Sequence, residues 1–263
     1  MTTGIRNPGE FCWSDLMTAD LNKTKPLFAK LFGWTYSDEP IPGGTLTLAK
    51  SGGKIIGALH DLTKDPRGKG VPPHWGVHVM TRSVDATAKA AAANGGKVLA
   101  PPMDIMENGR MCMFADPSGA KICAWQPKSK PGMDADSAQH GTPSWIELRT
   151  NDVDRCGVFY AKVFDWTPDV KNMAGGMQYT EFKMGTTSVA GMFGITKEMG
   201  PTPPHWACFV TVDKIDQTAK DCAANAGKVI VQPQDIPGIG RFACMQTADG
   251  MAFNGISWSQ AKP

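Results

Sequence analysis

The chain has 263 residues, 41% of them hydrophobic and 20% charged, so it is long enough for two modest domains that each bury a core. No apolar run reaches the roughly 18 residues of a membrane span, and a net charge of +2 without a Lys/Arg tract gives no reason to expect nucleic acid. We therefore expect a soluble protein with a small organic molecule as its partner. The first ten residues show no targeting signal and the seven cysteines form no Cys-x-x-Cys pair, which predicts a cytoplasmic location and reduced thiols.

The first predicted module is a strand, a helix and further short strands. Residues 11–18 alternate without a breaker, which predicts a strand. Asp20 is placed to cap a helix that runs through residues 25–32. Short strands should follow at 44–50 and 53–60, and we interpret the stretch as a βαβββ module.

A second module of the same kind follows directly. It opens with a strand at 75–81 and continues with a helix at 84–94. The module should end with strands near 97–100, 110–115 and 121–125.

The second half of the chain repeats the first at a nearly fixed offset. Matched pairs that lie 131 or 132 residues apart are Trp13 and Trp145, Asp20 and Asp152, Trp34 and Trp166, His74 and His205 within Pro-Pro-His-Trp, and Gly109-Arg110 and Gly240-Arg241. We therefore predict two domains of one fold, at 9–127 and 141–260. A polar, Pro- and Gly-containing surface linker is predicted at 128–140.

Several of these motifs resemble a known superfamily. The helix ending in Phe-Gly-Trp, the Asp-Pro-x-Gly turn before the last strand and two βαβββ units per copy resemble the vicinal oxygen chelate proteins, which include glyoxalase I, bleomycin resistance proteins and extradiol dioxygenases. Trp-x-(Asp/Glu)-Leu-x-Thr-x-Asp and Pro-Pro-His-Trp, with Asp-Ile-Pro-Gly-x-Gly-Arg-Phe at 235–242, resemble its tandem, glyoxalase-like branch. The resemblance implies an α+β fold of four βαβββ modules in two domains, each a cupped eight-stranded mixed sheet with helices outside and a cavity inside.

The resemblance also implies where a metal would bind. In metal-dependent relatives, His or Glu side chains on the first, fifth and last strands of a copy hold one divalent ion. Here those positions carry Trp13, Gly76 and Cys123 in copy one, and Trp145, Ala207 and Asn254 in copy two. Neither set supplies the imidazole and carboxylate donors of a usual first-row metal site. We therefore predict no cofactor and no standard glyoxalase I mechanism, and a rearranged, weaker metal site stays open.

Other residues of copy one share a strand face with these positions, because side chains two apart point the same way. The candidate cavity residues are Trp13, Asp15, Met17, His78, Met80 and Cys123. An imidazole beside a carboxylate suits proton abstraction next to a carbonyl, which makes Asp15 and His78 candidate catalytic residues. Alternatively, both are hydrogen-bonded residues that hold the sheet together. Cys123 is either a nucleophile or a small buried hydrophobe, and the tryptophan and methionines would form an adaptable apolar pocket.

Copy two presents a different set at the matching places. Its candidates are Trp145, Glu147, Arg149, Phe209 and Asn254. Glu147 is the second candidate base, and Arg149 beside Asn254 would orient an anionic or carbonyl substrate. The alternative is a salt bridge between Glu147 and Arg149. The repeated His74 and His205 are expected to fix a turn just before a strand.

Two functions remain open from the sequence. One is a lyase or isomerase that acts on a small carbonyl or thiol-adduct substrate without the usual metal ligands. The other is a binding protein that sequesters a small organic compound, as bleomycin resistance proteins do. We expect a monomer, since duplication often replaces the dimer formed by single-copy relatives.

Overall fold

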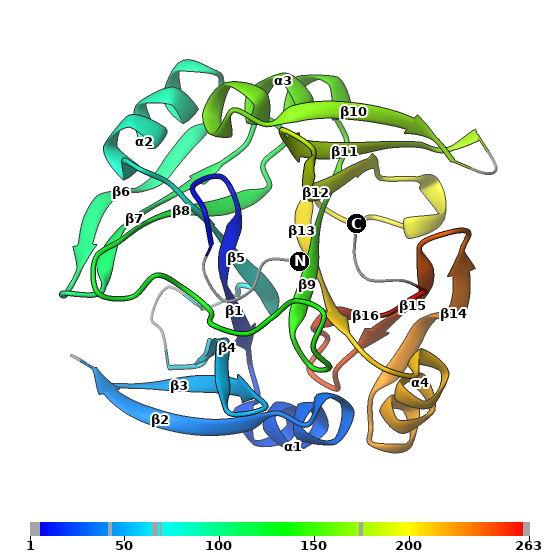
Figure 1. Cartoon of the computed structure of the whole chain (residues 1–263). Coiled ribbons are helices and arrows are strands. Elements are labelled where there is room, and N and C mark those ends of the chain that lie inside the picture. The colour runs from blue at the N-terminus through cyan, green and yellow to red at the C-terminus, as the bar shows by residue number, and fades with distance from the viewer. Residues whose placement is uncertain (1–5, 42–43, 65–67, 69, 174–175, 260–263) are drawn as a thin grey trace.

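Two eight-stranded mixed sheets, one from each half of the chain, make up the molecule (Figure 1). The computed structural model describes residues 6–41, 44–64, 68, 70–173 and 176–259. The strand orders are β2-β3-β4-β1-β5-β8-β7-β6 and β10-β11-β12-β9-β13-β16-β15-β14, so the second sheet repeats the topology of the first. Residues 1–5, on which the targeting expectation partly rests, and residue 260, the predicted end of copy two, lie outside the described residues.

The elements have the following bounds. Copy one contains β1 (Phe11–Thr18), α1 (Leu21–Phe32), β2 (Thr35–Ile41), β3 (Gly44–Ser51), β4 (Lys54–Asp61), β5 (His74–Met80), α2 (Val84–Ala93), β6 (Lys97–Ile105), β7 (Gly109–Ala115) and β8 (Lys121–Pro127). Copy two contains β9 (Pro143–Thr150), α3 (Val153–Phe164), β10 (Thr167–Asn172), β11 (Gln178–Met184), β12 (Thr187–Gly194), η3 (Lys197–Met199), β13 (His205–Thr211), α4 (Ile215–Ala224), β14 (Lys228–Ile236), β15 (Gly240–Gln246) and β16 (Ala252–Trp258).

The predicted α+β fold of tandem βαβββ modules is confirmed, down to the helix caps. The Asp20 carboxylate accepts a hydrogen bond from the Lys23 amide at 3.1 Å, which satisfies a donor that the first turn of α1 leaves open. Gly33 ends the helix in the left-handed region, with φ of 66°, where a residue without Cβ is not strained. The helix therefore begins and ends where its sequence directs.

Strand β2 is the element that the sequence did not locate. Its residues are exposed or half-buried throughout, so they lack the alternation of buried and exposed side chains by which a strand is recognised. The strand lies at the edge of the sheet, where Pro40 costs no ladder hydrogen bond on the open side. Strand β6, at the other edge, continues past the predicted end at residue 100 through Pro101 and Pro102 for the same reason.

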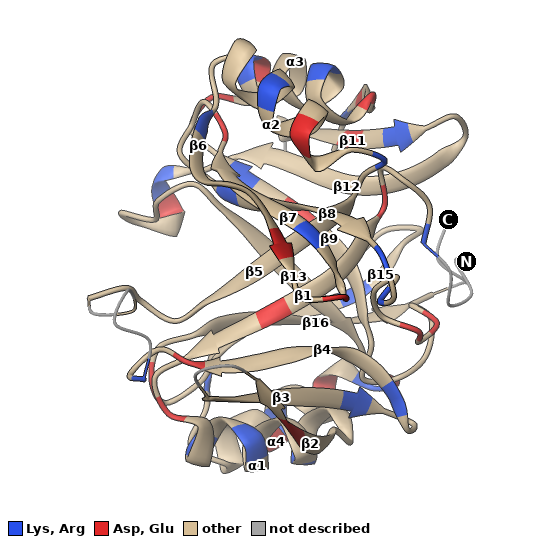
Figure 2. Ribbon diagram, turned by 90° about the vertical axis from the view of Figure 1, so that its left-hand side faces the viewer, with Lys and Arg blue, Asp and Glu red and all other residues tan. Residues whose placement is uncertain are grey.

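The two copies share one hydrophobic core. Helix α1 packs beside α4, and α2 beside α3, so the helix pairs lie at opposite ends of the molecule (Figures 1 and 2). Phe28 of α1 meets Phe253 of β16 edge to face, with 4.9 Å between ring centroids. The helices thus cover one face of each sheet, the face opposite the predicted cavity. Each helix also packs against a helix of the other copy.

Two tryptophans exchange hydrogen bonds between the copies. The indole N–H of Trp34 donates to the Gly141 carbonyl at 2.6 Å, and that of Trp166 donates to the Gly9 carbonyl at 2.8 Å. The two bonds correspond under the 132-residue offset, since 34 + 132 is 166 and 9 + 132 is 141. Both indoles are buried. Each copy therefore binds, through one indole, the backbone just before the first strand of the other copy.

The turns before the last strands also reach across. Asp116 accepts hydrogen bonds from the amides of its own turn through Oδ1, and its Oδ2 accepts the Tyr160 hydroxyl of copy two at 2.9 Å. In the other direction, Asp249 Oδ2 accepts from the Thr18 hydroxyl at 2.5 Å and from the Ala19 amide at 2.8 Å. The turn chemistry that the sequence revealed therefore also joins the two halves.

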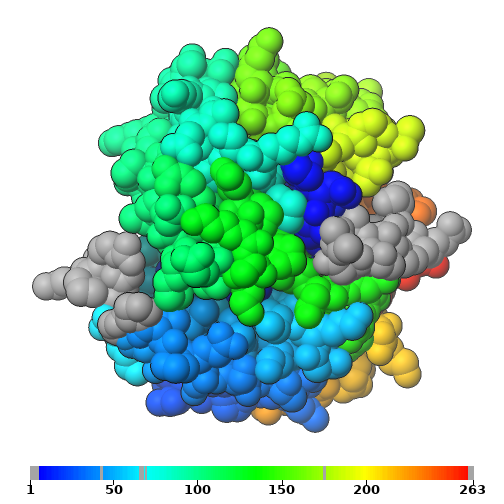
Figure 3. Space-filling model, turned by 60° about the vertical axis from the view of Figure 1, so that its left-hand side comes forward, coloured from blue at the N-terminus to red at the C-terminus, as the bar shows by residue number. Residues whose placement is uncertain are grey.

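The segment between the copies, predicted as a surface linker, is exposed at residues 128–131 and partly buried after them. Met133, Ala135 and Ser137 are buried, and the Met133 amide donates to the Cys12 carbonyl at 2.8 Å. In Figure 3 the green segment lies between the blue first module and the teal second module. Buried side chains alternate with more exposed polar ones at residues 133–137, where the segment packs against the copies. Composition alone had predicted that the whole segment is exposed.

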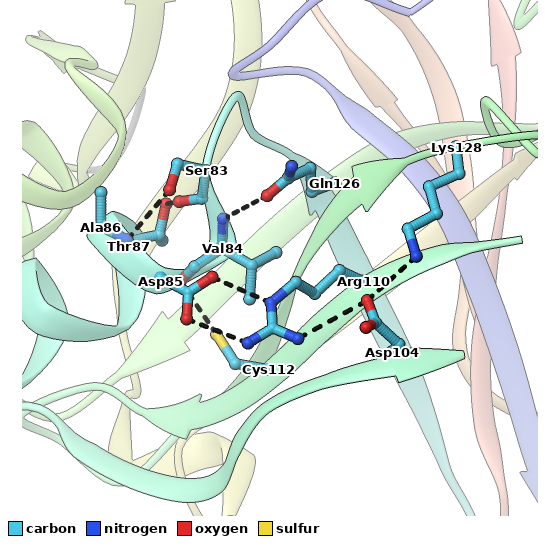
Figure 4. Close-up of polar contacts among 10 residues, drawn as sticks. All are labelled: Ser83, Val84, Asp85, Ala86, Thr87, Asp104, Arg110, Cys112, Gln126 and Lys128. Carbon is cyan, nitrogen blue, oxygen red and sulfur yellow. Dashed lines mark hydrogen bonds and ion pairs between the residues drawn. The ribbon is translucent and has the colours of Figure 1, made fainter. Parts of the chain in front are cut away.

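Charge pairs explain why Gly-Arg recurs in both copies. Arg110 donates to both oxygens of Asp85 in the first turn of α2, at 2.9 and 3.0 Å, and also pairs with Asp104 (Figure 4). Arg241 makes the matching pair of bonds to Asp216. The repeated arginines thus tie helices to strands.

Charged side chains of both signs are interspersed over the ribbon (Figure 2). Among the described residues, no helix is both long enough and apolar enough to cross a membrane.

Replacing Trp166 by Phe tests the exchange of hydrogen bonds. The variant leaves the Gly9 carbonyl without its donor and opens a small cavity, so we expect a loss of about 2–4 kcal/mol in the free energy of unfolding. Urea denaturation followed by fluorescence and by circular dichroism measures the loss, and both probes should show one transition because the core is shared. Ile230→Ala, at an exposed side chain, is the control and should change stability by less than about 0.5 kcal/mol. Two separate transitions in the wild type would contradict a shared core.

Candidate functional site

Each sheet turns one face to the shared core and leaves the other, here called the open face, without a covering layer of helices. On β1, Leu16 packs in the core, whereas Trp13, Asp15 and Met17 alternate with it and are half-buried on the open face. Backbone pairing sets Trp13 opposite His78, and His78 opposite Cys123. The period-two argument therefore predicted correctly which residues of β1, β5 and β8 lie near one another.

Asp15 is the centre of a polar cluster on the open face of copy one. Its Oδ2 lies 2.8 Å from Nε2 of His78, and its Oδ1 lies 3.1 Å from Nε2 of His60. The indole N–H of Trp13 donates to Oδ1 at 2.8 Å. Because an ionised carboxylate only accepts hydrogen bonds, both imidazoles carry their proton on Nε2. In the neutral rings, Nδ1 is then the basic nitrogen.

The cluster is reachable from solvent and strongly favours an ionised Asp15. The side chains of Asp15, His60 and His78 are 18%, 38% and 9% exposed. Burial opposes ionisation, but the hydrogen bonds from His60 and His78 outweigh it and hold the pKa of the Asp15 carboxyl well below its usual range. Asp15 is thus a weak base that stays ionised between its two imidazole neighbours.

His60 was not identified from the sequence. It lies on β4, which pairs with β1 in parallel so that His60 stands opposite Met17 and Ala58 opposite Asp15. This pairing joins strands that a helix and two other strands separate in the sequence, and no local sequence pattern indicates it. Alternation within 53–60 would have placed His60 and Ala58 on one face of the sheet. It would not have shown which neighbouring strand they lie beside.

His74 adds a third imidazole to copy one. It is the first residue of β5, rather than the residue before the strand, and its Nδ1 lies 2.9 Å from the Pro72 carbonyl. A carbonyl accepts, so Nδ1 carries the proton and Nε2 is the basic nitrogen. Burial lowers the pKa of His74. His205 repeats the contact with Pro203 at 2.8 Å, so the turn role that the sequence predicted is present in both copies.

Apolar and sulfur-containing side chains surround the cluster. Met80 and Cys123 are buried, and Met17 is half-buried. Burial, followed by the nearby Asp15 charge, raises the pKa of the Cys123 thiol, which therefore stays protonated and is a poor nucleophile. Backbone pairing places Met113 opposite Cys123, so sulfur recurs on adjacent strands. These side chains form an adaptable apolar surface beside a charged one.

The open face of copy two holds a network that satisfies itself. Arg149 lies 3.3 Å from Glu147 Oε1 and donates to Asn254 Oδ1 at 3.4 Å. The Tyr179 hydroxyl donates to Glu147 Oε2 at 3.1 Å and accepts from the Trp145 indole at 2.8 Å. The sequence analysis predicted that Trp145, Glu147, Arg149 and Asn254 lie close together. It did not predict Tyr179, which lies on β11, two strands away from β9.

The electrostatics of copy two differ from those of copy one. Burial raises the pKa of the Glu147 carboxyl, and the opposing effects of Arg149 and Tyr179 do not cancel it. Arg149 also lies over the Phe193 ring, 5.8 Å from its centroid. Phe209 packs with Trp145 in a small apolar cluster beside the network. The acid and base of this face neutralise each other.

The usual metal positions do not fit a divalent ion in either copy. Trp13 has only a donor N–H, already directed at Asp15, Gly76 has no side chain, and Cys123 is a buried protonated thiol. Among the described residues, no three His, Cys, Asp or Glu side chains are grouped to hold a metal. In copy one, the two imidazoles bind separate oxygens of Asp15.

The fold and the open faces define a tandem βαβββ protein with one candidate small-molecule site in each half. A family model, the Glyoxalase/Bleomycin resistance protein/Dioxygenase superfamily, matches residues 12–124 and again 142–254. The chain belongs to this superfamily.

Curated relatives match nearly the whole chain. Proteins named "Putative glyoxylase CFP32" from Mycobacterium bovis and Mycobacterium tuberculosis are 35% identical, over 92% of this chain and 92% of theirs. Anthracycline biosynthesis protein DauV from Streptomyces sp. is 32% identical, over 97% of this chain and 96% of its own.

Solved structures show the same fold at low identity. The Mn(II)-bound glyoxalase from Novosphingobium aromaticivorans has a TM-score of 0.65 at 17% identity, covering 97% of this chain and 83% of its own. The 2,3-dioxygenase LapB from Pseudomonas sp. KL28 has a TM-score of 0.64 at 12% identity, covering 98% and 93%.

Replacing Arg149 by Leu tests the self-satisfied network. The change leaves Glu147 buried without its cation, so we expect a loss of about 3–5 kcal/mol in the free energy of unfolding at pH 8. The pKa of Glu147 in the folded variant lies above its unfolded value of about 4.3, so stability is retained below that pH and lost as the pH rises through the folded pKa. Urea denaturation at pH 5 and pH 8 measures the difference. The double change Arg149→Leu with Glu147→Gln should recover most of the loss at pH 8, and an unrecovered loss would contradict a charge-based cause.

The tautomer of His74 can be read directly by NMR. We expect the ¹⁵N shifts of its ring to report a proton on Nδ1 at pH 7 and a pKa below about 6.5, because burial disfavours the charged ring. His140, a third-exposed histidine in the segment between the copies, provides the internal reference in the same spectrum. A proton on Nε2 of His74 at pH 7 would contradict the contact with Pro72.

Proposed function

We propose that the open face of copy one binds a small organic substrate and catalyses proton transfer on it. The substrate class is a small carbonyl compound or its thiol adduct, and the reaction is a lyase or isomerase step that does not use the family's ligand positions for metal. The observation that carries this proposal is the Asp15 carboxylate held between His60 and His78 at 3.1 and 2.8 Å.

The chemistry divides among the three residues. An imidazole takes a proton from the carbon next to a carbonyl and returns it to the product, and a base near neutral pKa suits that exchange. Asp15 fixes each ring and stabilises the imidazolium that forms, as a carboxylate does in catalytic triads. His60 is the more exposed ring, so an incoming substrate meets it first, and His78 lies deeper.

Copy two is the weaker candidate for this chemistry. Its acid, Glu147, is already bound to Arg149 and Tyr179, so a substrate would have to break a buried network before using it. Glu147 has no imidazole neighbour in these contacts. We therefore assign proton transfer to Asp15, His60 and His78, and treat Glu147, Arg149 and Asn254 as residues that hold the second sheet or bind a ligand without reaction.

Sequestration of an organic compound is the second candidate function. The methionine, cysteine and tryptophan side chains beside Asp15 support it, because such a surface adapts to flexible or flat molecules. The name of the Streptomyces relative, an anthracycline biosynthesis protein, supports an organic ligand in tandem chains of this kind.

Paired substitutions distinguish the two functions. We expect His78→Gln and Asp15→Asn to lower turnover of the hemithioacetal of methylglyoxal and glutathione about 100-fold or more, the usual share of acid–base catalysis. Binding of the same compound, followed by calorimetry, should change less than about threefold, since the substituted side chains stay polar and similar in size. Glu147→Gln, the matched change in copy two, should leave turnover within about threefold.

The outcomes separate cleanly. Equal losses from Glu147→Gln and His78→Gln would contradict the assignment to copy one. Binding without turnover of this adduct or of a panel of α-ketoaldehydes by the wild type would reject the enzyme and favour sequestration. Elemental analysis of the purified protein adds an independent check, because a stoichiometric first-row metal would contradict the ligand assignment made above.

A further inference from the structure

A cavity of about 260 Å³ lies between the copies and shares only Trp13 with the polar clusters of the open faces. It is bounded by the beginning of β1, the beginning of β9, the first residues of β12 and the packed segment between the copies. The proposed function gives no role to it. Its position makes it a site that neither copy would have alone.

Two buried hydroxyls in the cavity wall have unused hydrogen-bonding capacity. Ser14 and Ser137 are each 3% exposed, and both line the cavity. Their Oγ atoms have no hydrogen-bond partner within the described part of the chain. Buried hydroxyls normally make a hydrogen bond, and a buried hydroxyl without one is destabilising. A polar group in the cavity is the simplest partner for them.

Opposite charges also line this cavity. Arg6 is 5% exposed, and its guanidinium donates to the Ala135 carbonyl at 3.2 Å. Glu10 lines the same cavity, and its Oε2 accepts from the Asn7 amide at 2.7 Å. Asp136, in the same packed segment, adds a further negative charge near Arg6. The wall thus offers a cation, a carboxylate whose charge acts on that cation, and two hydroxyl groups.

Apolar side chains complete the wall. They are Phe11, Trp13, Met133, Pro143, Ile146 and Val189. The volume is just below the roughly 300 Å³ at which small-molecule pockets usually begin, so only a small occupant fits. Charges of both signs around a space of this size, whose wall is partly polar and partly apolar, complement a molecule that carries a carboxylate, an ammonium group and one hydrophobic side chain.

We propose that this cavity binds a free α-amino acid with an apolar or aromatic side chain. The ligand carboxylate meets Arg6 and the hydroxyls of Ser14 and Ser137, and its ammonium group meets Glu10. The side chain packs against the apolar wall. A neutral zwitterion suits the site better than a simple anion, because an anion would face Glu10 without compensation.

The cavity is connected to the Asp15 cluster through one side chain. Trp13 lines the cavity, and its indole N–H donates to Asp15 Oδ1. A ligand in the cavity therefore contacts the residue that helps to hold Asp15.

Calorimetric titration with three related compounds tests the proposal on the intact protein. The probes are L-phenylalanine, 3-phenylpropanoate, which lacks the ammonium group, and 2-phenylethylamine, which lacks the carboxylate. L-Leucine and L-methionine extend the panel to aliphatic side chains. We expect at least one of the amino acids to bind, and both single-charge analogues to bind at least tenfold more weakly than L-phenylalanine.

Substitutions then assign the contacts. Glu10→Gln should weaken L-phenylalanine at least tenfold while leaving 3-phenylpropanoate unchanged or improved. Ser137→Ala should weaken L-phenylalanine and 3-phenylpropanoate together. Ser37→Ala is the matched control, because its Oγ is also buried without a partner among the described residues but lies on β2, away from the cavity. It should change neither affinity.

Three results would overturn the proposal. The first is no binding of any of the three amino acids at millimolar concentration, which would leave water as the occupant. The second is equal affinity for L-phenylalanine and 3-phenylpropanoate, which would make the site a simple carboxylate site. The third is unchanged affinity in both Glu10→Gln and Ser137→Ala, which would place the ligand elsewhere. None of these depends on turnover at the Asp15 cluster.

Discussion

The exchange of buried side chains between the copies is the constraint on which the rest of the structure depends. Trp34 and Trp166 each donate to a glycine carbonyl at the entry of the opposite copy, and Asp116 and Asp249 each join a turn of one copy to the other. Such bonds tolerate little relative movement, because a buried donor or acceptor that loses its partner is costly. The two sheets are therefore fixed back to back, and their open faces are directed away from each other.

This arrangement explains why the copies agree in some places and differ in others. Residues that recur under the offset, such as Trp34 and Trp166 or Arg110 and Arg241, make the same contacts in both halves. The open faces contribute little to the shared core, so they were free to diverge. Copy one has a carboxylate between imidazoles, whereas copy two has an acid neutralised by an arginine. A single scaffold thus carries one surface with an ionised carboxylate between imidazoles and one surface whose charges pair with each other.

The sequence predicted those parts of the site that depend on local geometry. Alternation along a strand was enough to bring Asp15 near His78 and Glu147 near Arg149, because both relations need only one strand or an adjacent pair. His60 and Tyr179 were missed, since each reaches its acid from a strand whose place in the sheet is set by tertiary packing. Strand β2 was missed for lack of burial, and the segment after β8 was judged from composition although its small residues are buried. Long-range pairing and packing of small side chains leave little trace in a single sequence.

The packed segment between the copies has a consequence for how the chain can be cut or rearranged. In many two-domain proteins the joint is the natural place to separate the halves or to create new termini, because few contacts cross it. Here Met133, Ala135 and Ser137 are buried, and the Met133 amide bonds to β1 through the Cys12 carbonyl. A circular permutation opened between Met133 and Ser137 would therefore break contacts that hold this segment against β1.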